Sequence, residues 1–271
     1  MPAAMRGLAA LVLLARALSA QSASPPADPV PAHDTFTIAS RALGEARLIN
    51  VHVPARYASS SATSFAVLYM PDGGIDEDFP HVVNTVDSLI ALGTIRPVIV
   101  VGVPNTQRRR DLTGPTRVAS DSAIAPHVGG SAAFRRFFRD ELIPAIRARY
   151  RTTDERAIVG ESLAGLFIVE TFLVEPHLFN HFVAFDPSMW WNAGALVDSA
   201  PARLAAFDSS PRTLYLASSK DDIDDDTARL AAKIRTGTPL GLTWIYEPRS
   251  DLTHATIFRA TAPAALARAL R

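Results

Sequence analysis

One serine in the chain stands in a pattern that is typical of a nucleophile. Ser162 lies in the run GESLAG (160–165), between the apolar segment 156–160 and the helical segment 163–174. Small residues around such a serine let a strand and a helix approach closely across a strained turn. Backbone N–H groups at the start of the helix can stabilise negative charge, so the Leu163 N–H is the expected first oxyanion donor. A helix N-cap serine has the same local pattern, so the prediction needs catalytic partners.

His254 is the histidine that can act as general base for Ser162. A serine hydroxyl is a weak nucleophile that must lose its proton as it attacks, and an imidazole can accept that proton. When the serine follows a strand of a parallel sheet, the acid and then the histidine follow later strands. An acid-rich loop, 221–226, follows the strand-like segment 213–217, and His254 alone of the seven histidines lies beyond both. This order predicts one catalytic unit.

The residues leave the acidic member of that unit open. Asp221 is preferred because it lies nearest the end of segment 213–217, and Asp222 and Asp251 are the alternatives. The same loop begins like a calcium-binding loop, but a threonine and a lysine stand where that loop needs glycine and a bidentate glutamate. The chain has no cysteine. We therefore expect no metal and no organic cofactor.

A glycine-containing loop is predicted to supply the second oxyanion donor. The apolar segment 65–70 is followed by Pro-Asp-Gly-Gly, in which Gly73 and Gly74 can present a backbone N–H to the reacting oxygen. The alternative is a plain turn, in which Asp-Gly-Gly is common.

Strand-like runs alternate with helical stretches from residue 35 onward. Two runs alternate apolar and polar residues, 35–40 and 47–53, as a half-buried antiparallel pair does. Later runs are continuously apolar, as strands buried on both faces of a parallel sheet are: 65–70, 97–103, 156–160, 182–185, 213–217 and 242–246. Helices are predicted at 78–92, 131–150 (kinked or restarted at Pro144), 163–174, 222–235 and 261–270. The pattern predicts an α/β fold with a mostly parallel sheet of about eight strands and helices on both faces.

Five stretches make the chain resemble the bacterial putative-esterase family of α/β-hydrolases. That family includes siderophore, carbohydrate and feruloyl esterases, S-formylglutathione hydrolase and mycolyltransferases. The stretches are LYMPDG (68–73), VGVPN (101–105), ELIP (141–144), GESLAGLF (160–167) and DPSMWW (186–191). The last is the most telling, because family members often carry Ser-Pro-Ser-Leu-Trp-Trp there. Ala164 and Asp186 depart from the family pattern, which usually has glycine at the first position and serine or alanine at the second.

The resemblance implies ester cleavage through an acyl-enzyme, with Ser162 as nucleophile and His254 as base. Some siderophore esterases resemble a Ser–His dyad, so a site without an acid is a further alternative. The resemblance also implies a substrate pocket beside Trp190 and Trp191, which would otherwise be predicted as core residues. We assign Arg109 to the same pocket, with a solvated loop as the alternative.

Composition and the N-terminal segment restrict the class of protein. Of the 271 residues, 48% are hydrophobic and the formal net charge is zero, which indicates a folded domain and gives no reason to expect nucleic acid. Residues 1–23 resemble a signal peptide, with Arg6 before a short apolar stretch that could not span a bilayer. We expect a disordered Pro-rich leader at 24–34 and one domain at 35–271. This organisation predicts a periplasmic or secreted protein, and a cytoplasmic chain with a disordered N-terminus is the alternative.

These features together predict a serine ester hydrolase. Its substrate would be a small-molecule or carbohydrate ester, such as a siderophore lactone or an acylated sugar. The alternatives are an acyltransferase, which passes the acyl group to another alcohol, and a non-catalytic binding protein that retains the fold.

Overall fold

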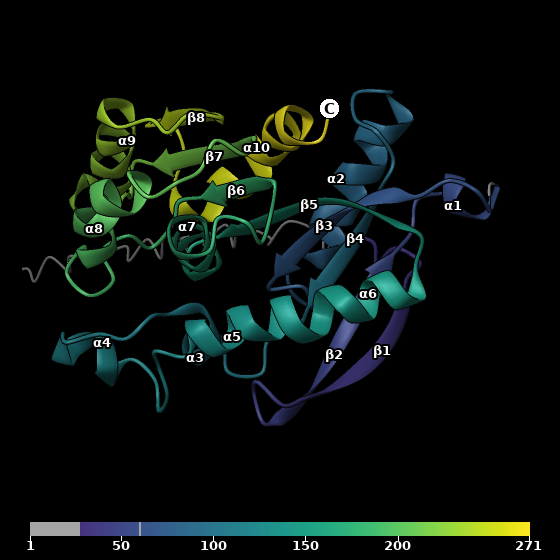
Figure 1. The fold of residues 1–271 in the computed structure, drawn as a ribbon, viewed down its shortest axis with the longest axis horizontal. Coiled ribbons are helices and arrows are strands. Elements are labelled where there is room, and N and C mark those ends of the chain that lie inside the picture. Colours follow the sequence, from purple (N-terminus) through teal and green to yellow (C-terminus); the bar gives the residue numbers. More distant parts are fainter. Residues whose placement is uncertain (1–27, 60) are drawn as a thin grey trace, which may run out of the picture.

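A single mixed sheet organises the protein. The computed structural model describes residues 28–59 and 61–271, which form an eight-stranded sheet of order β1-β2-β4-β3-β5-β6-β7-β8 (Figure 1). Its strands are β1 (Asp34–Ser40), β2 (Glu45–His52), β3 (Phe65–Pro71), β4 (Val98–Val103), β5 (Thr152–Glu161), β6 (His181–Phe185), β7 (Arg212–Ser219) and β8 (Leu242–Arg249). β1 pairs with β2 and β2 with β4 in antiparallel fashion, and all other pairs are parallel. The predicted mostly parallel α/β sheet is confirmed.

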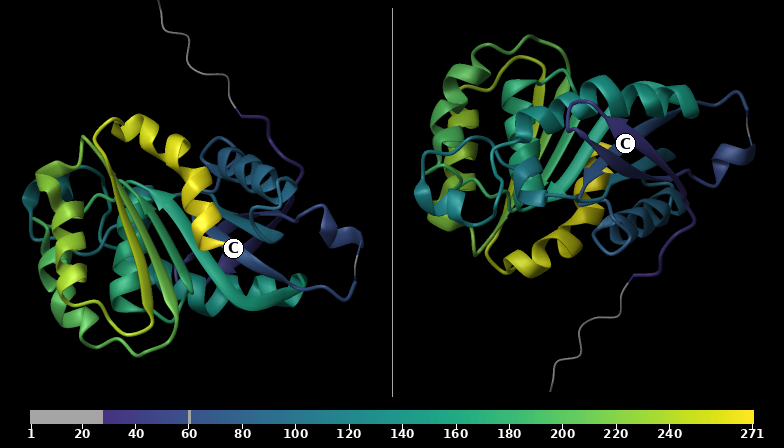
Figure 2. Two further views of the ribbon diagram at one scale, coloured as in Figure 1. Left: turned by 90° about the horizontal axis from the view of Figure 1, so that it is seen from above. Right: turned by 90° about the horizontal axis from the view of Figure 1, so that it is seen from below.

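Helices cover both faces of this sheet (Figure 2). On one face, α2 (Phe79–Ala91) and α10 (His254–Ala269) pack in one apolar cluster. The other face carries α3 (Arg108–Leu112), α5 (Ser131–Phe137), η1 (Phe138–Leu142), α6 (Ile143–Arg149), α7 (Leu163–Val174), α8 (Ala195–Leu204) and α9 (Asp226–Thr236). The short α1 (Arg56–Ser59), α4 (Ala119–Ala123) and η2 (Ile223–Asp225) lie in connections. Because helices cover both faces, the central strands β3 and β4 are buried along their whole length.

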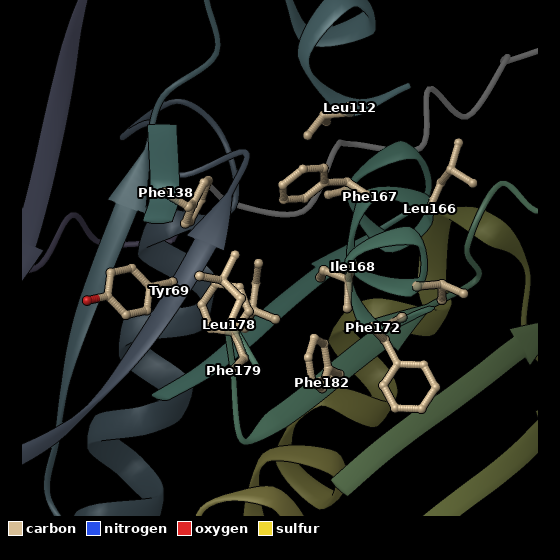
Figure 3. Close-up of a cluster of buried hydrophobic side chains, with 14 of the residues drawn as sticks. Tyr69, Leu112, Phe138, Leu166, Phe167, Ile168, Phe172, Leu178, Phe179 and Phe182 are labelled. Atoms are coloured by element: carbon tan, nitrogen blue, oxygen red, sulfur yellow. The ribbon is translucent and has the colours of Figure 1, made fainter. Parts of the chain in front are cut away.

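The helix α7, which follows β5, is almost completely buried. Phe167, Ile168 and Phe172 pack against Phe179 and Phe182, between the helix and the sheet (Figure 3). The helix is apolar all round, which is typical of a helix enclosed by other elements. This packing fixes the start of α7, where the candidate nucleophile lies.

The helix predicted at 131–150 with a restart at Pro144 is confirmed: α5, η1 and α6 follow one another without a break, and a π-helical turn precedes Ile143, where α6 begins with Pro144 in its first turn. Two other helices differ from the prediction. The last helix begins at His254 instead of residue 261, because a Thr253 capping box starts it and Pro263 is tolerated inside it. The sequence analysis also missed α8, whose apolar pattern Pro201 obscures.

The described part of the expected leader is attached to the domain. Asp28 pairs with Arg259 at 2.6 Å, and the carbonyl oxygen of Ala32 lies 2.8 Å from His52 Nδ1. Residues 28–34 therefore differ from a free, disordered leader, and Asp34 already belongs to β1. The predicted signal peptide, 1–23, lies outside the described residues.

Candidate active site

Ser162 occupies a strained turn between β5 and α7. Its backbone has φ 60° and ψ −122°, a conformation that non-glycine residues rarely adopt. The turn is held from both sides: the Ser162 N–H donates to the Phe185 carbonyl at 3.0 Å, and its own carbonyl accepts from the Ser188 N–H at 3.1 Å. The serine therefore lies at the carboxyl edge of the parallel strands, where ligands bind in open α/β sheets.

Small residues next to the turn permit this geometry. A Cβ atom on Gly160 would lie 2.7 Å from the Ala164 Cβ, and one on Gly165 would lie 3.0 Å from the Pro187 Cα. Both distances are shorter than ordinary contacts, so larger residues would push strand and helix apart. The expected reason for the small residues in GESLAG agrees with these distances.

The imidazole of His254 is bound by Asp186. Nδ1 of His254 lies 2.6 Å from Asp186 Oδ2, and Asp186 is 5% exposed. Two further donors hold the same carboxylate: the Ser219 N–H bonds Oδ1 and the Ser219 hydroxyl bonds Oδ2, each at 2.8 Å. The three residues come from three places in the chain: the turn after β6, the end of β7 and the start of α10.

Electrostatics favour the charged form of both partners in this pair. Burial tends to raise the pKa of Asp186, but the hydrogen bonds from His254 and Ser219 outweigh it and hold the pKa below its ordinary value. The hydrogen bond to Asp186 is the largest effect on His254 and raises its pKa above 6.5, with a further contribution from the charge of Glu161. A carboxylate that fixes Nδ1–H leaves Nε2 free to accept a proton.

The prediction that Asp221 receives the imidazole N–H is wrong. Asp221 Oδ2 accepts the backbone N–H of His254 at 2.9 Å, so it anchors the first turn of α10 and not the ring. Of the alternatives, Asp222 accepts the N–H and the hydroxyl of Thr227 at the start of α9. Asp251 is exposed and pairs with Arg249 at 2.7 Å.

The predicted oxyanion donors differ in their availability. The Leu163 N–H is in the first position of α7, where the helix supplies no acceptor for it. The Gly73 N–H instead donates to the Val103 carbonyl at 3.1 Å, and the Gly74 N–H donates to the Glu77 carboxylate at 2.7 Å. Neither glycine N–H is free in this structure, so the predicted role of Gly73 and Gly74 as ready donors is not what the geometry shows.

The Ser162 hydroxyl has a neighbour that the sequence analysis did not identify. Its Oγ lies 3.4 Å from the Oγ of buried Ser188. Among the hydrogen bonds of the described residues, none joins Ser162 to His254. Catalytic hydrogen bonds are often loose before substrate binds, so this arrangement is compatible with a serine–histidine pair that tightens on binding.

The residues assigned to a substrate pocket lie in different surroundings. Trp191 is 4% exposed and its Nε1 donates to the Gly114 carbonyl at 2.8 Å, while Trp190 is partly buried against the same core. Trp191 nevertheless lines a cavity of about 250 Å³ with Leu166. Arg109 is exposed and donates to the Ile124 carbonyl at 2.8 Å, in a separate surface hollow.

Arg108, which the sequence analysis did not select, is the basic residue on the side of the oxyanion loop. Its guanidinium binds Asp72 through two hydrogen bonds of 2.8 and 2.7 Å.

In the segments that the structure describes, no group of three His, Asp or Glu side chains could hold a metal ion. No helix in those segments is long and apolar enough to cross a membrane.

Comparison with known proteins shows the family of the chain. A sequence model of the family described as "Putative esterase" matches residues 40–230. The chain belongs to this family. It is 33% identical over 109 residues to the ferri-bacillibactin esterase BesA of Bacillus subtilis, which covers 35% of this chain and 38% of the relative. It is 30% identical over 128 residues to a siderophore triacetylfusarinine C esterase of Aspergillus fumigatus, 42% of either chain. The chain thus matches less than half the length of these curated relatives.

Solved structures resemble the chain over most of its length. An IroE-like serine hydrolase from Shewanella oneidensis has a TM-score of 0.79 and 26% identity, and the match covers 88% of this chain and 79% of the other. The siderophore hydrolase EstB of Aspergillus nidulans has a TM-score of 0.72 at 20% identity, covering 90% and 96%. The fold is that of the α/β-hydrolases.

Proposed function

We propose that this protein is a serine ester hydrolase that cleaves a carboxylic ester through an acyl-enzyme on Ser162. His254 takes the Ser162 proton as the oxygen attacks, and Asp186 stabilises the imidazolium that forms. The Leu163 N–H stabilises the oxyanion of the tetrahedral intermediate. Protonated His254 then passes its proton to the leaving alcohol, and water, activated by the same imidazole, releases the acid.

The observation that carries this proposal is the His254–Asp186 pair beside a strained serine. A structural serine does not need a φ of 60°, and a surface histidine does not need a buried carboxylate with three donors. Strain and buried ionic pairs occur where the surrounding structure holds a functional geometry. A binding protein without catalytic activity would not need a strained serine beside a His254–Asp186 pair.

We further propose a siderophore ester as the substrate class. The relatives include a ferri-bacillibactin esterase and two proteins named as siderophore esterases, of triacetylfusarinine C and of enterobactin. We also propose that residues 1–23 direct the protein out of the cytoplasm, on the basis of their signal-like sequence. Mass spectrometry of the mature N-terminus tests the second point, since an intact Met1 would contradict it.

Labelling with a fluorophosphonate tests the mechanism, because the reagent modifies only an activated serine. We expect the wild-type protein to be labelled on Ser162 and to hydrolyse esters from a panel of 4-nitrophenyl esters, feruloyl esters, acetylated sugars and siderophore lactones. A folded Ser162→Ala variant should do neither. Labelling at another residue, or equal hydrolysis by the variant, would contradict the proposal.

A further inference from the structure

Glu161 places a carboxyl group directly beside the candidate nucleophile. It is the last residue of β5, and its Cα lies about 3.8 Å from that of Ser162 across a trans peptide. Its Oε1 atom is buried and has no hydrogen-bond partner in the structure. A buried carboxyl oxygen without a partner costs free energy, so its retention next to the reacting serine calls for an explanation.

Five charged groups interact with Glu161. They are His254 and Arg259 on α10, Asp78 before α2, Asp186 after β6 and Arg108 on α3. Burial is the main cause that raises the pKa of Glu161 to about 7, with His254 opposing it and Asp78 adding to it. Burial and the neighbouring Asp72 likewise raise the pKa of Asp78 to about 6. At neutral pH and above, this side of Ser162 therefore gains negative charge.

The two arginines near this group are bound to other carboxylates. Arg108 binds Asp72 through both its Nε and Nη2, and Arg259 binds Asp28. Among the ion pairs of the described residues, none includes Glu161, Asp78 or Glu77. Glu77 is held by the Gly74 N–H and by Asn105, which are uncharged donors. Glu161 thus has no ion-pair partner of its own among the described residues, and it lies at the end of β5 paired with Phe185 of β6, close enough to His254 for the two charges to interact.

We propose that Glu161 sets the charge specificity of the site: it disfavours esters with an anionic group next to the scissile bond and favours esters with a cationic group, such as an ammonium, there. The inference rests on the proposed esterase function and names a substrate class within it. The charge of Glu161 acts on His254, the base that must reach the scissile ester, so it also acts on a charged group close to the scissile carbonyl. Charges interact more strongly in such a partly buried site than in water.

A matched set of substrates measures this specificity. Three 4-nitrophenyl esters with short acyl chains of equal length would carry a methyl, a carboxylate or a trimethylammonium group at the end of the chain, close to the scissile bond. For the wild-type protein at pH 8 we expect kcat/KM to be highest for the cationic ester and lowest for the anionic one. The separation between neutral and anionic esters should be about tenfold, the scale of one partly screened charge. Equal rates for these two esters would overturn the inference without any variant.

Two variants then assign the effect to Glu161. Glu161→Gln keeps the size of the side chain and should raise the anionic-to-neutral ratio of kcat/KM about tenfold. Asp154→Asn is the control, because it removes one negative charge from the opposite end of the same strand, where the side chain is 83% exposed. An unchanged ratio in Glu161→Gln, or an equal change in Asp154→Asn, would overturn the inference.

The pH dependence of the ratio is a second measurement that needs no variant. Glu161 disfavours anions only when it is ionised, so the wild-type anionic-to-neutral ratio should fall as pH rises from about 6 to about 8. Protonation of His254 lowers kcat/KM for all three esters alike, so this effect cancels in the ratio. Ionisation of Asp78 adds to the fall of the ratio at the lower end of this pH range. A flat ratio would contradict the role of Glu161. If the wild-type protein does not hydrolyse the neutral ester through Ser162, the proposed esterase function itself is contradicted.

Discussion

Replacement of Asp186 by Asn tests the least expected residue of the candidate site. In the wild-type protein, Oδ1 accepts the Ser219 N–H, while Oδ2 accepts the Ser219 hydroxyl and the His254 Nδ1–H. An asparagine that keeps the Ser219 N–H bond must place its NH2 group where Oδ2 was. That group can only donate, so it favours the ring tautomer with Nδ1 unprotonated and the proton on Nε2. Nε2 is the atom that has to accept the Ser162 proton.

The size of the effect follows from this change of tautomer. The corresponding substitution in a well-studied serine triad lowers kcat about 10⁴-fold while the geometry is kept. Such a loss corresponds to about 5 kcal/mol of transition-state stabilisation. We expect a loss of this order in Asp186→Asn, because the carboxylate is buried and no other acidic side chain in the described residues is hydrogen-bonded to the ring of His254.

Turnover of a neutral 4-nitrophenyl ester measures the loss, with folding checked by thermal unfolding. Asp221→Asn is the matched control, because its amide oxygen can still accept the His254 backbone N–H. We expect that control to lose less than about tenfold, because Asp221 is an exposed carboxylate whose role the amide can take over. The reasoning is refuted if Asp186→Asn stays within tenfold of the wild type, or if Asp221→Asn loses more than Asp186→Asn does.

Three other perturbations test the same site. His254→Ala should lose nearly as much kcat as Ser162→Ala, on the order of 10⁴-fold or more, and the double variant little more; losses that multiply would mean that the residues act separately. kcat/KM for a neutral ester should rise with pH around a midpoint above 6.5, because the base must be unprotonated and Asp186 raises its pKa; a higher midpoint in Asp186→Asn would contradict this. Ser162→Gly should unfold about 2–4 °C higher than Ser162→Ala, because glycine tolerates the positive φ at a gain of about 1 kcal/mol; an equal or lower Tm would argue against strain.

The sequence predicted the sheet well because its signals are strong and local. Continuous apolar runs and their alternation with helical segments located the parallel strands to within a few residues, as for 182–185 and β6. The strand-to-helix position of Ser162 was likewise visible, because glycine and alanine beside it serve a steric need. Helix ends were harder, since the Thr253 capping box and the tolerated Pro263 act through three-dimensional packing.

The acid could not be chosen from the sequence for a physical reason. Asp186 and Asp221 both follow a parallel strand, so both lie at the carboxyl edge of the sheet, near the start of α10. Which of them reaches the imidazole depends on backbone conformation: Asp186 has a φ of 42°. One indication was present, since aspartate replaces a residue that the family usually has as serine or alanine. The glycine loop was misjudged because the Gly73 N–H bonds the distant Val103 carbonyl and the Gly74 N–H bonds the side chain of Glu77, and neither bond has a signature in the sequence.

A non-glycine residue with a positive φ follows each of three neighbouring strands. Asp72 follows β3 with a φ of 53°, Ser162 follows β5 with a φ of 60°, and Asp186 follows β6 with a φ of 42°. Each strained residue turns a polar side chain out of a strand whose own residues are buried. Asp72 binds Arg108, Asp186 binds His254, and Ser162 lies beside Leu163 at the start of α7. Strain of this kind costs of order 1–3 kcal/mol at each position and persists only where packing overrides it. Three adjacent parallel strands share one carboxyl edge, so their strained turns bring the nucleophile, the acid and the ion pair together there. Glycine at any of these three positions would relieve the strain but remove the side chain.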